Sequence, residues 1–122
     1  MGTFNVDGTV QSIRPSKKPM QIRKLPVDTG SGYTWIDEHE LRGAGVTVRK
    51  RDLRFVMANG QTVTRSTGYA ILRVGEFETV DEVVFGQPGD LQLLGARTLE
   101  GFPAAVDARR KRLVAAGPMP AA

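Results

Sequence analysis

The chain of 122 residues has no cysteine and one histidine, and only 7% of its residues are aromatic. The absence of cysteine excludes disulfide frameworks, thiolate zinc sites and thiol nucleophiles. The single histidine, His39, cannot form a multi-histidine metal site, and we assign it no role. No run of eighteen apolar residues is present, which excludes a membrane-spanning helix. Residues 1–10 lack the basic stretch and apolar core of a secretory signal. We therefore expect a cytoplasmic protein that uses no metal, no cofactor and no membrane.

The sequence does have an excess of basic charge. Seventeen Lys and Arg against thirteen Asp and Glu give a net charge of +4. The basic residues form three groups, within residues 14–24, 49–54 and 109–112. Such groups indicate either solvated strand edges and turns or contacts with nucleic acid. We favour solvated edges because the charge is modest and no aromatic residues alternate with the basic ones, as they do on a base-stacking surface.

Apolar residues recur mostly at every second position, which is the spacing of β-strands. This pattern predicts about eight short strands, including one over residues 46–48, one over 91–94 and a final pair near 104–106 and 113–114. Residues 63–74 form a long predicted strand in which Gly68 indicates a bulge or kink. We expect an all-β fold, a closed β-barrel of one domain over residues 1–114, followed by a flexible tail over residues 115–122.

Local signals predict one or two short helices and a hairpin. Asp37, with Glu40 three residues later, is typical of a helix start, and Gly43 would end that helix. Residues 96–101 predict a second helical segment. Asn59-Gly60 lies between two strand-like runs, which is the strongest short signal for a β-hairpin.

Asp28 is the most distinctive acidic residue of the chain. It follows the apolar run Leu25-Pro26-Val27 and precedes Thr29-Gly30-Ser31-Gly32. We expect an acid at the end of a buried strand to be partly desolvated, with the N–H groups of a glycine-rich loop bonding its carboxylate. The alternative interpretation is an Asx turn, in which Asp28 accepts from an amide two residues on.

The string Leu25-Pro26-Val27-Asp28-Thr29-Gly30-Ser31 resembles the catalytic loop of aspartic proteases, and Trp35 follows at the spacing of pepsin-like enzymes. Leu93-Leu94-Gly95, before residues 96–99, resembles the second hallmark of the retropepsin-like branch, where two apolar residues and a glycine precede a short helix. Asn59-Gly60 lies between the two motifs, where that family carries its substrate-covering flap. From Phe4 to Leu113 the order of parts is similar to that of a retropepsin-like aspartic protease. Ala96 stands where retroviral enzymes carry arginine, and Arg97, one position later, is a candidate substitute.

The resemblance implies an acid-protease-type barrel with a flap hairpin and an aspartic endopeptidase acting on polypeptides. It assigns catalysis to Asp28, Thr29 and Gly30, and substrate binding to Ser31 and to the flap residues Ala58, Asn59, Gly60 and Gln61. By resemblance, Thr29 would bond across a two-fold axis, the Gly30 amide would bond the Asp28 carboxylate, and the Ser31 hydroxyl would touch its outer oxygen.

This chemistry needs two carboxylates that share one proton. The chain contains no second Asp-Thr-Gly: Ser66-Thr67-Gly68 lacks the acid, and neither Asp81 nor Asp107 is followed by glycine. We therefore expect a homodimer in which Asp28 of each copy meets at the axis.

Several apolar residues are candidates for subsite walls and equally for core: Val27, Trp35, Val63, Ile71 and Leu93. Two other functions remain open. The first is an inactive binding or dimerisation module with the same fold. The second is a small basic β-barrel that binds nucleic acid through residues 49–54 and 109–112, which leaves the Asp28 loop unexplained.

Overall fold

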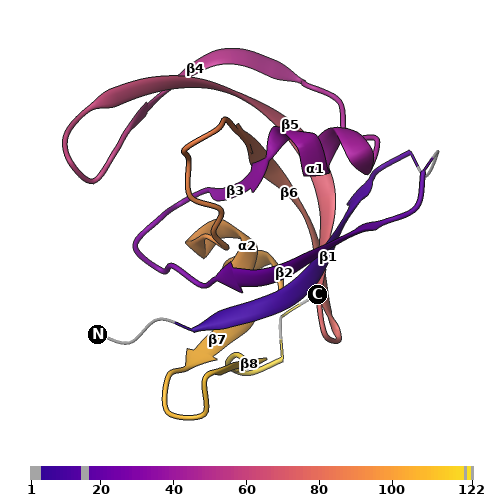
Figure 1. The fold of residues 1–122 in the computed structure, drawn as a ribbon. Helices are drawn as coiled ribbons and strands as arrows, with labels where there is room; N and C mark the ends of the chain where they lie inside the picture. The colour runs from indigo at the N-terminus through magenta and orange to yellow at the C-terminus, as the bar shows by residue number, and fades with distance from the viewer. Residues whose placement is uncertain (1–3, 15–16, 120, 122) are drawn as a thin grey trace.

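The computed structural model describes residues 4–14, 17–119 and 121. Across these residues the chain forms eight β-strands and two short helices, arranged as in Figure 1. The fold is mostly β, as the alternation of apolar residues predicts. In chain order the elements are β1 (Asn5–Ser12), β2 (Met20–Pro26), β3 (Thr34–Asp37), α1 (Glu38–Gly43), β4 (Lys50–Val56), β5 (Thr62–Val74), β6 (Phe77–Gly86), α2 (Ala96–Gly101), β7 (Ala104–Asp107) and β8 (Arg112–Ala115).

Six of these strands form one sheet. Its order is β2-β1-β5-β6-β3, and β4 pairs with β5 outside this path. Within the described strands, β3 and β6 run parallel and the other pairs are antiparallel. The two ends of the path, β2 and β3, do not pair, so no sheet of the described residues closes and the expected closed barrel is not formed. Residues 93–94 lie across this gap through single bridges to Val27 and Trp35, and two residues are too short a segment to form a full ladder.

The core is a single cluster of apolar side chains supplied by β1, β2, β3, β5, β6, both helices and the loops between them. Val10 of β1, Ile36 of β3 and Leu41 of α1 are fully buried. Val83, Val84 and Phe85 of β6 are also fully buried in succession. An unbroken apolar run is typical of a strand that is covered on both faces, and this part of β6 fits that description because successive side chains point to opposite faces and all three are buried.

Local predictions are confirmed at most turns. The β4–β5 hairpin turns at Asn59-Gly60, and β7 pairs with β8 through Ala105 with Val114 and Val106 with Leu113. The helix α1 begins after Asp37 and ends at Gly43 as predicted, but Asp37 makes no side-chain capping bond. Instead the main-chain N–H of Asp37 donates to Gln92 Oε1 at 2.9 Å.

Three local predictions are wrong. Residues 46–48 form a loop that buries Val46, and residues 91–94 contribute only the two bridges at 93 and 94 instead of a strand. No bulge occurs at Gly68, which pairs in regular register with Val83. The bulge lies on the opposite strand, β4, between Lys50 and Leu53.

Gly68 is instead required by close packing. A Cβ at this position would collide with the main-chain carbonyl of Thr47 and with the Phe85 ring. We predict that Gly68→Ala lowers the free energy of unfolding by about 1–3 kcal/mol, because a well-packed interior has little room to yield. Gly32→Ala is the matched control, since a Cβ there meets no atom within 4 Å. Urea unfolding of both variants, followed by circular dichroism, measures the difference, and equal midpoints would contradict this role.

Candidate functional site

The Asp28 loop begins where β2 leaves the sheet. Asp28 donates its N–H to the Leu94 carbonyl at 2.9 Å, and Leu94 donates its N–H to the Pro26 carbonyl at 2.7 Å. Gly30 then donates its N–H to Asp28 Oδ1 at 2.9 Å. This bond is the one that the family resemblance implies, and it is also an Asx turn. Asp28 is exposed, as are Thr29 and Gly30, so the expected desolvation of the acid is wrong for a single chain. Val27 is the last residue of this run whose side chain enters the core.

The rest of the loop is held by the start of α2. Ser31 accepts from the Ala96 N–H at 2.7 Å, and Gly32 accepts from the Arg97 N–H at 3.0 Å. The Ser31 hydroxyl donates to the Tyr33 carbonyl at 3.0 Å and not to Asp28, unlike the expectation from the family. Gly95 fits beneath this loop because it has no side chain, since a Cβ there would collide with the Tyr33 carbonyl.

A buried chain of hydroxyl groups joins β3 to α2. The Gly95 N–H donates to Thr34 Oγ1 at 2.9 Å, and Thr98 Oγ1 donates to Asp81 Oδ2 at 2.8 Å. The Thr34 and Thr98 hydroxyls lie 2.6 Å apart. All groups are satisfied if Thr34 donates to Thr98, because Thr98 already donates to Asp81. Hydrogen bonds of main-chain and hydroxyl groups therefore join the segment after Asp28 to the segment that begins at Leu93.

Arg97 supports the same loop from α2. Its guanidinium lies over the Tyr33 ring, 4.4 Å from the ring centroid. It also lies 3.9 Å from Glu82 Oε1. Arg97 thus connects Tyr33, next to the Asp28 loop, to Glu82 of β6. Its role as a substitute for the arginine that retroviral enzymes carry at position 96 stays a prediction.

Asp28 lies on the wall of an open groove with a volume of about 550 Å³. Three segments far apart in sequence form this groove: the loop after β2 with the start of β3, the end of β4 with the hairpin turn, and residues 89–93. Its lining residues are Asp28, Gly30, Ser31, Gly32, Tyr33, Trp35, Phe55, Val56, Met57, Ala58, Gly89, Asp90, Leu91 and Leu93.

The hairpin turn between β4 and β5 reaches the groove by its first half. Gly60 donates its N–H to the Met57 carbonyl at 2.9 Å and has a φ of 85°. Asn59 accepts the Gln61 N–H at 2.9 Å through its side-chain oxygen. Of the residues predicted to bind substrate, Ser31 and Ala58 line the groove, whereas Asn59, Gly60 and Gln61 build the turn and do not line it. Of the predicted catalytic residues, Asp28 and Gly30 line it and Thr29 does not.

Two aromatic side chains that the sequence analysis did not single out, Tyr33 and Phe55, pack beside Trp35 inside the groove. The Phe55 ring on β4 meets Tyr33 and Trp35 edge-on, with ring centroids 5.2 Å and 5.4 Å apart. Phe55 lies near the end of β4 and Met57 directly follows that strand. Their spacing of two residues is the one local signal that could have identified them. Aromatic pairs of this kind contribute more stabilising free energy than their buried area alone would give. They therefore hold the β4–β5 hairpin against the start of β3.

The apolar candidates for subsite walls divide into two sets. Trp35 and Leu93 line the groove, and Trp35 is 6% exposed without joining the main core cluster. Val27 belongs to the core, and Val63 and Ile71 are not lining residues. Two apolar residues that the sequence analysis missed are largely exposed at the groove: Val56 at 77% and Leu91 at 81%.

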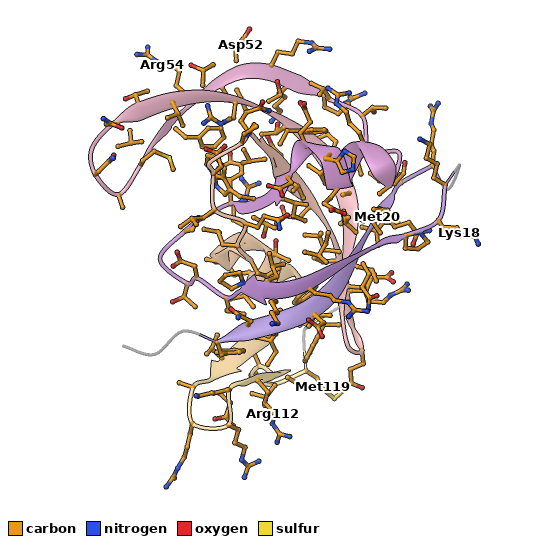
Figure 2. The ribbon with its side chains drawn as sticks, viewed as in Figure 1. Lys18, Met20, Asp52, Arg54, Arg112 and Met119 are labelled. Carbon is orange, nitrogen blue, oxygen red and sulfur yellow. The ribbon has the colours of Figure 1, made fainter. Side chains whose placement is uncertain are left out.

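The basic groups do not share one surface. Figure 2 shows Lys18 at the β1–β2 end of the molecule, Arg54 on β4 and Arg112 at the opposite end from Arg54. Several arginines elsewhere are paired with carboxylates, among them Arg65 and Arg73. In the part of the chain that the structure describes, no three acidic or histidine side chains cluster as metal ligands. No helix in that part has both the length and the apolar character needed to cross a membrane.

Glu82 is a buried charged residue of β6. Its side chain is 6% exposed and accepts from the Thr67 hydroxyl at 2.7 Å and from Lys50 Nζ at 3.3 Å. Burial raises the pKa of Glu82, but the hydrogen bonds from Thr67 and Lys50 outweigh burial, so its pKa lies below the ordinary value of 4.5. The ionised carboxylate therefore stabilises the fold, and it ties β4, β5 and β6 to one another.

We predict that Thr34→Val destabilises the protein by about 1–3 kcal/mol, because the Gly95 N–H loses its acceptor in a buried position. Thr34→Ser keeps the hydroxyl and should retain most of the stability. Chemical unfolding followed by circular dichroism compares the two variants. If valine and serine are equivalent at this position, the hydroxyl chain does not support the site.

We also predict a specific dependence on pH. A carboxylate whose pKa is lower in the folded state stabilises the fold at pH values above its unfolded pKa, and this stability is lost as the pH falls through the folded pKa. Glu82→Gln should therefore lower the melting temperature at pH 7 and flatten its decline below about pH 4.5. Glu100→Gln, at an exposed position on α2, is the control and should follow the wild type. A wild-type pH profile for Glu82→Gln would contradict the prediction.

Comparison with known proteins adds no family to this geometry. No protein-family model matches the chain, and no curated protein matches it. The function must therefore be argued from the groove and from the order of the sequence motifs.

Proposed function

We propose that the chain is one subunit of a homodimeric aspartic endopeptidase with a retropepsin-like, acid-protease-type fold. The single observation that carries the proposal is the composition of the groove. Asp28 of the Asp-Thr-Gly loop, the first half of the hairpin turn and Leu93, two residues before Gly95, all line it. These are the three parts that the family resemblance assigns to the acid, the flap and the second hallmark.

The main-chain bonds around Asp28 support this assignment. The Asp28 N–H donates to the Leu94 carbonyl, and Asp28 Oδ1 accepts from the Gly30 N–H. Both the main chain and one carboxylate oxygen of Asp28 are therefore fixed. The other oxygen has no bond partner among the described residues. The chain has one Asp-Thr-Gly sequence. A second copy of the chain would therefore supply the second carboxylate.

The chemistry follows from two such carboxylates that share one proton. The ionised Asp28 takes a proton from a water molecule, whose oxygen attacks the peptide carbonyl carbon. The protonated Asp28 of the second copy donates its proton to the carbonyl oxygen, which gives a tetrahedral diol. Asp28, which now holds the proton taken from water, donates it to the amide nitrogen, while the ionised Asp28 of the second copy takes a proton from one hydroxyl of the diol. The C–N bond then breaks, the products are a carboxylic acid and an amine, and one water molecule is consumed.

The walls of the groove favour an extended peptide with apolar side chains. Phe55, Trp35 and Leu93 line its interior, and Val56 and Leu91 expose apolar surface at its rim. The turn over Asp28 offers main-chain groups with which an extended peptide can bond as an added strand. We therefore expect cleavage between apolar residues in unstructured polypeptide.

We predict that Asp28→Asn reduces peptide cleavage by at least about 10²- to 10⁴-fold, which is the usual contribution of a general acid or base. The variant should remain a dimer, because asparagine keeps the acceptor for the Gly30 N–H. Cleavage is measured with quenched fluorescent peptides at mildly acidic pH, and the oligomeric state by sedimentation. A peptide with a secondary hydroxyl in place of the scissile carbonyl should inhibit the wild type.

Asp52→Asn is the matched control for this experiment. Asp52 is exposed on β4 and has a φ of 58°, a conformation that asparagine tolerates. It should cleave like the wild type. Undiminished cleavage by Asp28→Asn would remove Asp28 from the mechanism. A dimer that binds peptides but cleaves none would instead identify an inactive binding module.

A further inference from the structure

One wall of the groove is a short loop outside the strands. Residues 89–91 line the groove, and Leu91 on its rim is 81% exposed. The loop is closed by a turn in which Asp90 donates its N–H to the Gln87 carbonyl at 2.9 Å and accepts the Gln87 N–H at Oδ2 at 2.8 Å. The core cluster contains none of residues 87–91. Something other than core packing must therefore fix the position of this wall.

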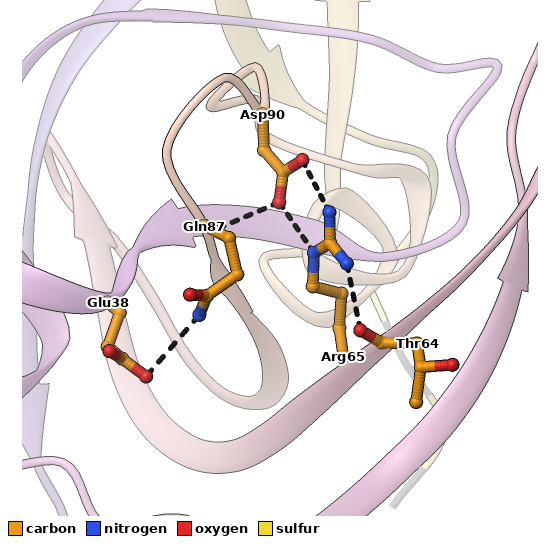
Figure 3. Close-up of polar contacts among 5 residues, drawn as sticks. All are labelled: Glu38, Thr64, Arg65, Gln87 and Asp90. Carbon is orange, nitrogen blue, oxygen red and sulfur yellow. Dashed lines mark hydrogen bonds and ion pairs between the residues drawn. The ribbon is translucent and has the colours of Figure 1, made fainter.

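Arg65 on β5 supplies that anchor (Figure 3). Its Nε donates to Asp90 Oδ2 at 2.7 Å and its Nη2 to Asp90 Oδ1 at 2.8 Å. Its remaining nitrogen, Nη1, donates to the Thr64 carbonyl at 2.8 Å, which fixes the guanidinium to its own strand. A guanidinium that binds both oxygens of a carboxylate defines orientation as well as distance.

The pair is shielded from water. The side chains of Arg65 and Asp90 are 18% and 12% exposed, whereas those of Arg73 on β5 and Glu78 on β6, which also form an ion pair, are each 50% exposed. Exposed ion pairs hold their side chains weakly because solvent screens them and side-chain entropy opposes them. The shielded, doubly bonded pair is therefore the stronger constraint of the two.

The main chain of Arg65 belongs to the β4–β5 hairpin, which is the predicted flap. Arg65 is opposite Leu53 in the β4–β5 ladder, on the arm of the hairpin whose turn covers the groove. The wall loop has a second, weaker tie to α1, where Gln87 Nε2 donates to Glu38 Oε1 at 3.4 Å. The Arg65–Asp90 pair is thus a direct link between the flap arm and the wall that carries Leu91.

We propose that Arg65 and Asp90 are positioning residues that set the width of the groove at Leu91 and thereby select the size of the apolar side chain accepted there. This inference rests on the proposed peptidase function for its catalytic consequence. Neither residue needs to touch the reacting atoms. Loss of the pair would free residues 87–91 from the flap arm, so the wall could no longer discriminate between a large and a small side chain.

The pair also stays charged where such an enzyme works. The hydrogen bond from Arg65 lowers the pKa of Asp90 below its ordinary value of 3.8; burial opposes this effect, and the Gln87 amide adds to it. The carboxylate is therefore ionised at mildly acidic pH, and the link persists under the conditions of the cleavage assay.

The test compares Arg65→Gln, Asp90→Asn and the double variant with Arg73→Gln, an exposed arginine of the same strand. Two peptides that differ only in leucine or alanine beside the scissile bond are cleaved by each protein. We predict that the wild type prefers leucine and that breaking the pair reduces this preference in kcat/KM by about tenfold, a range typical for apolar pockets. The change should arise in KM for the leucine peptide, with kcat within about twofold of the wild type.

Two measurements without catalysis separate this inference from the proposed function. The first is hydrogen exchange of residues 87–91, which should accelerate at least about tenfold in the three variants and not in Arg73→Gln. The second is the affinity for the same two peptides on the Asp28→Asn background, measured by the fluorescence of Trp35, the only tryptophan of the chain. If the wild type cleaves neither peptide, but breaking the Arg65–Asp90 pair removes the preference for the leucine peptide in binding affinity, the peptidase function is refuted and the positioning role is supported. Unchanged exchange, or faster exchange with unchanged preference, would overturn the positioning role.

Discussion

The structure depends on the main-chain bonds that residues 93–94 make with two other segments. Leu94 exchanges bonds with Pro26 and Asp28, and Leu93 exchanges N–H to O bonds of 3.0 Å in both directions with Trp35. Through them, two residues join the end of β2 to the middle of β3, which are otherwise the unpaired ends of the main sheet. Buried main-chain groups must be paired, so the Asp28 loop can only lie where these bonds place it. The orientation of the candidate acid is therefore a property of the fold and not of its own side chain.

Sequence reasoning succeeded where structure is local. The turn at Asn59-Gly60, the end of α1 at Gly43 and the β7–β8 pair follow from residue types at short spacing, since turn conformation and strand alternation are decided within a few residues. The same reasoning failed on closure of the barrel, because β2 and β3 are strands whose pairing depends on how far the whole sheet curves. It also interpreted Gly68 as a bulge or kink, and no bulge occurs there. A glycine in a strand signals either a bulge or a close approach of another segment, and at Gly68 the close approach of Thr47 is the cause.

The site was predicted in outline and missed in its side chains. Asp28, Ser31 and Ala58 were identified from motifs, and they do share one groove. Phe55 was missed because its ring contacts Tyr33, which is more than twenty positions away in the sequence, and no spacing rule predicts such a contact. The Arg65–Asp90 and Lys50–Glu82 pairs were missed for the same reason. Charges that look like solvated strand edges in a sequence become internal ties when the sheet folds one strand onto another.

Gly95 shows how little freedom this arrangement leaves at its centre. Its hydrogen atom faces the Tyr33 carbonyl, its N–H binds Thr34, and the chain on either side carries the bonds to the Asp28 loop and the first turn of α2. Substitutions at exposed positions of the hairpins, away from the groove, can therefore leave the fold intact, whereas even a methyl group at position 95 would push the acid-bearing loop away from the helix. Directed evolution of altered selectivity in this scaffold should begin at the rim and leave that one position untouched.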